Sequence, residues 1–96
     1  MGEVANIRAG KRSCSLVSPA REVFNGLVDQ VDAPGVEGDF GVLADHAPFM
    51  TALREGPVTV YDAKGVRRFE VRGGFADVNA AGLTILAEEA VEIAAG

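Results

Sequence analysis

Glycine and proline interrupt this chain at short intervals, and their spacing constrains the fold more than any other feature of the sequence. There are twelve glycines and four prolines in 96 residues. The stretches between them are about five to eight residues long, which is the usual length of a β-strand. Such frequent breaks leave little room for helix, so the spacing predicts an all-β protein.

Alternation of apolar and polar residues supports this prediction. Val58–Asp62 alternates cleanly, Ala63-Lys64-Gly65 can form a tight turn, and Val66–Arg72 then returns. The remaining strands are expected at Ser13–Ser18, Glu22–Ala33, Asp39–Leu43, Phe49–Arg54, Phe75–Asn79 and Leu83–Ala87. About eight or nine short strands with hairpin spacing are typical of a β-sandwich or a barrel.

Two segments are less regular than the others. Glu22–Ala33 is long for a strand, and we expect Pro34-Gly35 to end it. Leu86–Ala95 is rich in Ala and Glu, which favour helix, whereas the alternation of Val91 and Ile93 favours a strand. We expect a last strand in this segment, which leaves little or no helix in the chain.

The length and apolar content indicate one folded domain. A chain of 96 residues suits a single domain. Its hydrophobic content of 48% is too high for a disordered chain with a net charge of −5. We expect a frayed lead-in at 1–12, a single β-sandwich domain at 13–94 and a short tail at 95–96.

The distribution of charge argues against nucleic acid as a partner. The nine basic residues are scattered, whereas phosphate binding needs them clustered. Between Asp29 and Asp45 there are five acids and no base. A surface of one sign can steer a basic partner, or it can simply keep the protein soluble. The charge pattern alone leaves both interpretations open.

Catalytic and metal sites are poorly supported. His46 is the single histidine and Cys14 the single cysteine, so neither a Ser-His-Asp triad nor a four-ligand zinc site can be assembled convincingly. Gly73-Gly74 and the pair Gly35 and Gly38 lack the sequence pattern of a phosphate-binding loop. No run of 18 apolar residues is present, so any membrane association has to go through a partner. We expect no catalysis, no cofactor and no metal.

Without a catalytic set, the loops become the best candidates for function, because loops carry binding residues more often than cores do. The longest stretch that reads as irregular is Ala33–Pro48. It combines glycines, the acidic run and His46, and we expect a binding surface there.

An ordered series of short motifs resembles the epsilon subunit of F-type ATP synthases. The series runs from about Leu16 to Ala90, nearly the whole chain. Each motif alone is weakly specific for the family, whereas the whole set of motifs in this order is strongly specific for it. Its parts are Leu16-Val17-Ser18-Pro19, Glu22-Val23-Phe24-Asn25-Gly26, the segment Ala33–Leu43, His46-Ala47-Pro48, Gly73–Val78 and Leu83–Glu88.

The resemblance implies a ten-stranded β-sandwich and a non-catalytic role. In that family the domain binds the gamma subunit and touches the polar loops of the ring of c subunits. It thereby belongs to the rotor that couples proton flow to ATP synthesis. The resemblance further implies a peripheral position on the cytoplasmic face of a bacterial inner membrane, through the complex. No nucleotide binding is expected.

Site residues follow from the family positions that this sequence matches. The matching positions place Val36, Glu37, Gly38 and Asp39 against the c ring, whose loops carry an Arg in the family. Ser18, His46 and Thr51 match positions that face gamma. The acidic run then has a plausible basic partner.

Three departures from the family pattern matter. Ala44-Asp45 stands where the family usually has Pro-Gly, which changes the loop before His46. The family's chains usually continue into a C-terminal helical hairpin that inhibits hydrolysis, whereas this sequence ends at Gly96. We therefore expect no inhibition by that arm. The lead-in at 1–12 is also longer than usual.

The sequence also allows an interpretation that assigns the chain to a different class of protein. The chain can also be read as a stand-alone β-sandwich module that binds a peptide or a carbohydrate at its loops. The absence of Trp and the single Tyr argue against carbohydrate binding. The single cysteine argues against an extracellular module stabilised by disulfides.

Overall fold

The computed structural model describes residues 12–43, 48–79 and 82–93, which form ten β-strands. Their bounds are β1 Arg12–Val17, β2 Glu22–Val28, β3 Gln30–Gly35, β4 Gly38–Leu43, β5 Phe49–Leu53, β6 Gly56–Asp62, β7 Gly65–Val71, β8 Gly74–Asn79, β9 Gly82–Ala87 and β10 Ala90–Ile93. The all-β prediction is confirmed. None of these residues forms a helix that could cross a membrane.

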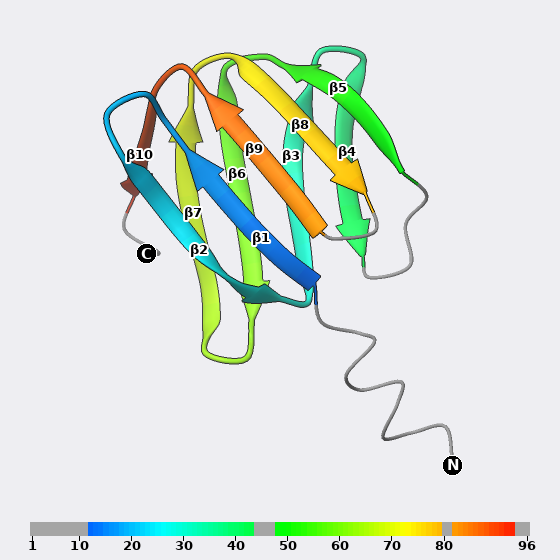
Figure 1. Ribbon diagram of the computed structural model, residues 1–96, viewed down its shortest axis with the longest axis vertical. Helices are drawn as coiled ribbons and strands as arrows, with labels where there is room; N and C mark the ends of the chain where they lie inside the picture. Colours follow the sequence, from blue (N-terminus) through cyan, green and yellow to red (C-terminus); the bar gives the residue numbers. More distant parts are fainter. Residues whose placement is uncertain (1–11, 44–47, 80–81, 94–96) are drawn as a thin grey trace.

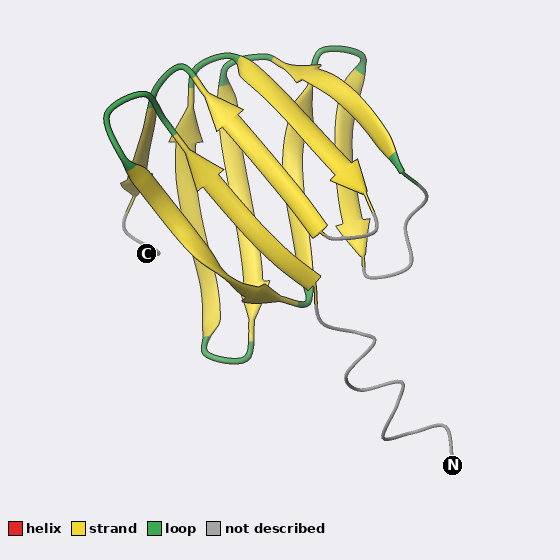
Figure 2. Ribbon diagram, in the orientation of Figure 1, coloured by secondary structure: helices red, strands yellow, loops and turns green. Residues whose placement is uncertain are grey.

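The strands lie in two layers, one in front of the other in Figures 1 and 2. The back layer has the order β10-β7-β6-β3-β4, and the front layer has the order β5-β8-β9-β1-β2. The front strands cross the back strands diagonally (Figure 1). One residue pair, Gly35 of β3 with Leu53 of β5, joins the two layers. The molecule is therefore a β-sandwich whose layers are continuous at one corner.

The hydrophobic core fills the space between the layers. Phe69 of the back layer is fully buried, and its ring meets that of Phe24 edge to face at 5.9 Å between centroids. At the opposite edge of the sandwich, Phe40 and Phe49 form a second edge-to-face pair at 5.3 Å. Such pairs contribute about 0.5–1.5 kcal/mol beyond the area they bury. Two aromatic pairs thus hold the layers together at their two open edges.

The prediction of one strand at Glu22–Ala33 is wrong. The segment forms two strands with Asp29 between them, and the Asp29 N–H donates to the Tyr61 carbonyl at 2.8 Å. Val28 and Val31 are both buried although they are three positions apart. A single strand with a period of two cannot bury both, so the chain has to turn at Asp29.

Pro34 and Gly35 are the last two residues of β3, so the strand ends at Gly35, two residues later than the predicted end at Ala33. Gln30–Asp32 pair with β6, and Gly35 pairs with β5, so the neighbour of β3 changes in between. Pro34 has no N–H to donate and lies in this interval, where its carbonyl accepts from the Arg54 N–H at 2.9 Å.

The irregular stretch predicted at Ala33–Pro48 is also mostly strand. Gly38–Leu43 forms β4 and pairs along its length with β3, from Gln30↔Leu43 to Gly35↔Gly38. The glycines within this stretch therefore serve a hairpin and not a long loop. Ala44-Asp45 and His46 lie outside the residues that the structure describes.

Candidate functional site

The turn between β3 and β4 carries the acidic residues that the sequence singled out. Val36, Glu37, Gly38 and Asp39 are all exposed there. The Val36 N–H donates to the Ala52 carbonyl at 3.0 Å, which holds the turn against β5. Gly38 has φ +139°, a backbone conformation that a side chain would strain. The turn has a defined shape and projects its side chains into solvent.

The two acids of this turn differ in their electrostatic state. Asp39 forms an ion pair with Arg54, at the end of β5. Glu37 forms no ion pair with any residue whose position is described. Exposed ion pairs contribute at most about 1 kcal/mol, so Asp39 can exchange Arg54 for a partner's cation at little cost. Glu37 can pair with a partner's cation without first giving up an ion pair within the chain.

Ser18 begins the turn between β1 and β2. Its N–H donates to the Arg21 carbonyl at 2.9 Å, and its hydroxyl donates to the same carbonyl at 3.3 Å. The side chain is half-buried and borders a shallow hollow of about 340 Å³, whose wall includes Phe75 and Leu86. Ser18 is thus held rigidly beside an apolar surface.

Thr51 lies in β5, away from Ser18. It pairs with the buried Ala76 of β8, so its side chain points between the layers and is half-buried. Its hydroxyl donates to the neighbouring Ala52 carbonyl at 3.2 Å. The structure brings Ser18 and Thr51 into the same layer but not into contact, and His46 is outside the described residues.

The outer surface of the front layer carries an apolar row that the sequence reasoning missed. Residues from four neighbouring strands line up through the pairs Ala52↔Phe75, Phe75↔Leu86 and Leu86↔Val17. Phe75 and Leu86 are each 55% exposed. Met50 points out of the same layer and is 65% exposed. We call this surface the apolar face; its residues are Val17, Met50, Ala52, Phe75 and Leu86.

A weak signal for the apolar face exists in the sequence. In Phe75–Asn79, Ala76 and Val78 form the buried side of the strand, which leaves Phe75 on the other side. A strand with apolar residues on both sides is either covered on both faces within the fold or uses one face to bind a partner. The alternation alone did not reveal which side was the core.

The outer surface of the back layer is largely polar. The Asp32 carboxylate accepts from the Gln30 amide at 2.8 Å and from the Tyr61 hydroxyl at 3.0 Å. The hydrogen bond to Asp32 raises the pKa of Tyr61 above its ordinary value. Exposed apolar side chains in the strands of this layer lie toward one edge, at Val66 of β7 and at Val91 and Ile93 of β10. The two layers therefore present different chemistry to solvent.

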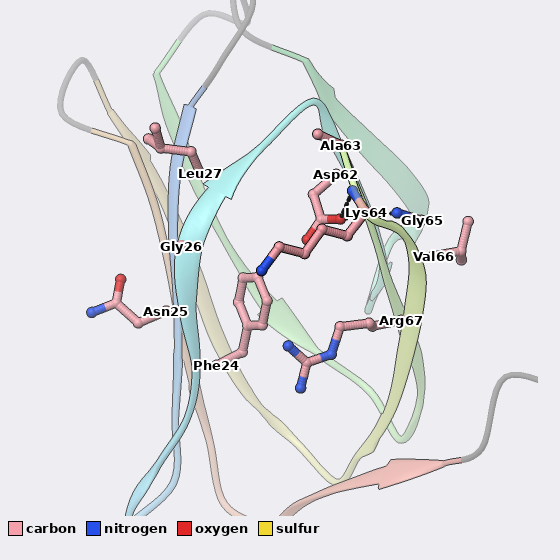
Figure 3. A pocket seen from close by; sticks show the side chains of 10 residues that line it. All are labelled: Phe24, Asn25, Gly26, Leu27, Asp62, Ala63, Lys64, Gly65, Val66 and Arg67. Carbon is pink, nitrogen blue, oxygen red and sulfur yellow. Dashed lines mark hydrogen bonds between the residues drawn. The ribbon is translucent and has the colours of Figure 1, made fainter.

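A cleft of about 560 Å³ opens between β2 and the β6–β7 hairpin (Figure 3). The Arg67 guanidinium lies 5.1 Å from the Phe24 ring centroid and donates two hydrogen bonds of 2.8 Å to Glu92. These bonds lower the pKa of Glu92. Asp62 accepts from the N–H groups of Lys64 and Gly65 and so shapes the hairpin turn. The charged groups here serve the fold and do not form a reactive set.

Cys14 is unsuited to nucleophilic chemistry. It is fully buried on β1, and burial raises the pKa of its thiol to about 12. The thiolate is the reactive form of cysteine, so this residue behaves as a small apolar core residue. Among the described residues, no group of three His, Cys, Asp or Glu side chains could hold a metal ion.

Similarity to known proteins extends over almost the whole domain. Residues 11–93 match the family model described as the beta-sandwich domain of the ATP synthase delta/epsilon chain. The ATP synthase epsilon chain of Caulobacter vibrioides is 68% identical over 80 residues, which cover 83% of this chain and 93% of that one. The epsilon chain of Hyphomonas neptunium is also 68% identical, over 83 residues that cover 85% of this chain.

This chain spans only part of several relatives. It covers 62% of the Hyphomonas protein and 65% of the Maricaulis maris epsilon chain, which is 58% identical. A chain in a structure of the Euglena gracilis mitochondrial ATP synthase matches with a TM-score of 0.80 and 27% identity, over 86% of this chain and 54% of that one. A Tetrahymena thermophila ATP synthase chain has a TM-score of 0.71 and 18% identity over 82% of this chain and 64% of its own, and shows the shared fold.

Sequence similarity and overall fold agree on one assignment. The match begins and ends within one residue of the ten-stranded sandwich, and relatives more than half identical carry the same name. The chain belongs to the ATP synthase delta/epsilon chain family, and the described residues form the beta-sandwich domain of that family.

Proposed function

We propose that this chain is a non-catalytic subunit of the rotor of a proton-translocating F-type ATP synthase. It links the gamma subunit to the ring of c subunits and so couples proton flow to ATP synthesis. Its relatives are named ATP synthase epsilon chains, and the Euglena match comes from an assembly that includes the c ring. The chain is then held at the cytoplasmic face of a bacterial inner membrane by its partners.

The observation that carries this proposal is the apolar face. A monomeric soluble protein rarely leaves several large apolar side chains in one row on a sheet surface, whereas a subunit interface is built from such a row. Phe75 and Leu86 are more than half exposed and are neighbours across two strands. Gamma docks on this face, and its contact buries the row.

Two of the three residues matched to gamma-facing positions, Ser18 and Thr51, lie next to the apolar face. Ser18 lines the hollow beside Phe75 and Leu86. Thr51 lies between Met50 and Ala52, two residues of the apolar face, although its own side chain points between the layers. We include Ser18, His46 and Thr51 in the gamma interface, with Thr51 acting through the position of β5.

The c ring meets the turn formed by Val36, Glu37, Gly38 and Asp39. This turn lies between β3 and β4, beside the β5 end of the apolar face, where the Val36 N–H donates to the Ala52 carbonyl, so the two partners bind next to each other. A cationic loop suits it, because Glu37 carries a free charge and Asp39 can exchange its partner. Such exposed pairs determine register more than affinity.

Titration with the cognate gamma subunit tests the proposal. The purified chain should form a one-to-one complex at micromolar concentration, measured by isothermal titration calorimetry, and should hydrolyse no ATP. The heat-capacity change should be negative, because binding buries apolar surface. Absence of a complex at micromolar concentration would refute the assignment to the rotor.

A further inference from the structure

Asp77 is a carboxylate placed at the border of the apolar face. It lies on β8 and points out of the front layer, two residues after Phe75. Its direct neighbours across the two flanking strands are Met50 on β5 and Thr84 on β9. Directly paired side chains in an antiparallel sheet have Cβ atoms about 4.5–5.5 Å apart. One neighbour of Asp77 is therefore apolar and the other is polar.

Within the described part of the chain, the Asp77 carboxylate forms no hydrogen bond and no ion pair. The side chain is already half-buried by its neighbours. Two other acids lie at this surface. Glu88 follows β9 and lines the hollow beside Phe75 and Leu86, and Glu22 lies on the edge strand β2, where its carboxylate accepts from the Asn25 amide at 3.3 Å. Asp77 thus differs from Glu22 in position and in hydrogen bonding.

A partner that covers Phe75 and Met50 also covers Asp77, because all three share one surface. The carboxylate then loses the water that solvates it in the free chain. A buried carboxylate is strongly unfavourable unless it is paired with a cation or accepts hydrogen bonds. The partner segment has to bring such a group to this position.

We propose that Asp77 is a specificity-determining residue of the docking face and pairs with a lysine or arginine of the gamma segment that covers Phe75. This inference rests on the proposed function, because it takes gamma as the occupant. The apolar row supplies the area, and Asp77 selects among apolar partner surfaces by charge. A partner without a cation at this position would leave a carboxylate buried and unpaired.

The polar row beside Asp77 fits this assignment. Thr84 pairs with Asp77, and Ser15 pairs with Thr84, so the row next to the apolar one is polar across three strands. An interface of this kind has an apolar centre and a polar border that fixes orientation. Asp77 lies where the two rows meet, which is the position where an ion pair is both shielded and oriented.

Binding of the cognate gamma subunit is measured for the wild type, Asp77→Asn, Asp77→Glu and Asp77→Lys at several salt concentrations. Glu70→Gln is the matched control, because Glu70 is a half-buried acid on β7, in the other layer. Asp77→Asn should weaken binding at least about tenfold and Asp77→Lys about a hundredfold. Asp77→Glu should retain more affinity than Asp77→Asn.

The salt dependence provides a readout that a structural role would not change. Wild-type affinity should fall as salt rises, and Asp77→Asn should flatten this dependence, whereas Glu70→Gln should leave both unchanged. Thermal unfolding of each variant verifies that the fold persists.

The outcomes separate this inference from the proposed function. If Phe75→Ser weakens binding by about thirtyfold while Asp77→Asn stays within about twofold of wild type at every salt concentration, the role of Asp77 is overturned and gamma docking stands. If wild type binds gamma but neither substitution affects binding, the apolar face is not the interface and the inference is overturned with it. If the wild type itself does not bind gamma, the proposed function is overturned.

Discussion

Phe75 of β8 pairs directly with Leu86 of β9, and both side chains point away from the core with 55% of each exposed. Neighbouring β5 and β1 extend this pair through Ala52 and Val17. The pair adds little to the stability of the isolated chain, because both side chains remain in water. We expect the pair to contribute to the free energy of binding when a partner buries it.

The first prediction concerns this pair. Phe75→Ser and Leu86→Ser should each weaken gamma binding by about thirtyfold, since a central interface residue often contributes about 2 kcal/mol. The free energy of unfolding should change by less than about 1 kcal/mol in each case. Calorimetry and urea unfolding measure the two quantities. Val66→Ser is the control, because Val66 is 41% exposed on the opposite layer; equal effects from Val66→Ser would contradict the assignment.

The second prediction concerns the acidic turn. Asp39→Lys reverses a charge and places it beside Arg54, the present partner of Asp39. ATP synthesis driven by a proton gradient in reconstituted vesicles should fall, by no more than about fivefold, because an exposed pair contributes at most about 1 kcal/mol. Gamma binding should be unaffected. Unchanged synthesis in Asp39→Lys would remove this residue from the contact with the c ring.

The third prediction compares two glycines with positive φ. Gly74 has φ +126°, and a Cβ there would lie 2.0 Å from the Leu86 carbonyl oxygen, whereas Gly38 has φ +139° and open space around it. Gly38→Ala should therefore cost only backbone strain, about 1–3 kcal/mol. Gly74→Ala adds a steric clash with the adjacent strand and should cost clearly more. Urea unfolding measures both, and equal losses would show that the clash is relieved without cost.

The fourth prediction is a pH dependence from the Arg67–Glu92 pair. The two hydrogen bonds from Arg67 lower the folded-state pKa of Glu92 below its ordinary value of 4.5. A lowered folded pKa stabilises the native state above about pH 4.5, and this contribution is lost as the pH falls through the lower folded value. Glu92→Gln should therefore have a lower Tm than wild type at pH 7.

The same two proteins should converge in acid. Once Glu92 is protonated in the folded wild type, the charged pair is gone and the substitution no longer matters. Differential scanning calorimetry from pH 7 to pH 3 measures the difference in Tm. A difference that stays constant across this range would show that the pair acts through packing of Arg67 on Phe24 and not through charge.

The sequence by itself determined the fold class and the family. Glycine and proline at short intervals left only strand-length segments, and that local restriction holds in any tertiary context. The alternation in Val58–Asp62 and Val66–Arg72 placed β6 and β7 to within two residues. The ordered motifs from Leu16 to Ala90 indicated the family, which the comparisons confirmed.

The tertiary structure alone decided how the strands divide and which sides face solvent. Asp29 separates two strands because the Val28 and Val31 side chains both enter the core. The apolar face exists only because pairing across four strands aligns Val17, Ala52 and Phe75 with Leu86, residues far apart in the chain. Alternation has a period of two and assigns residues to opposite sides, but it carries no information about which side another layer will cover. Strand pairing and layer packing supply that choice.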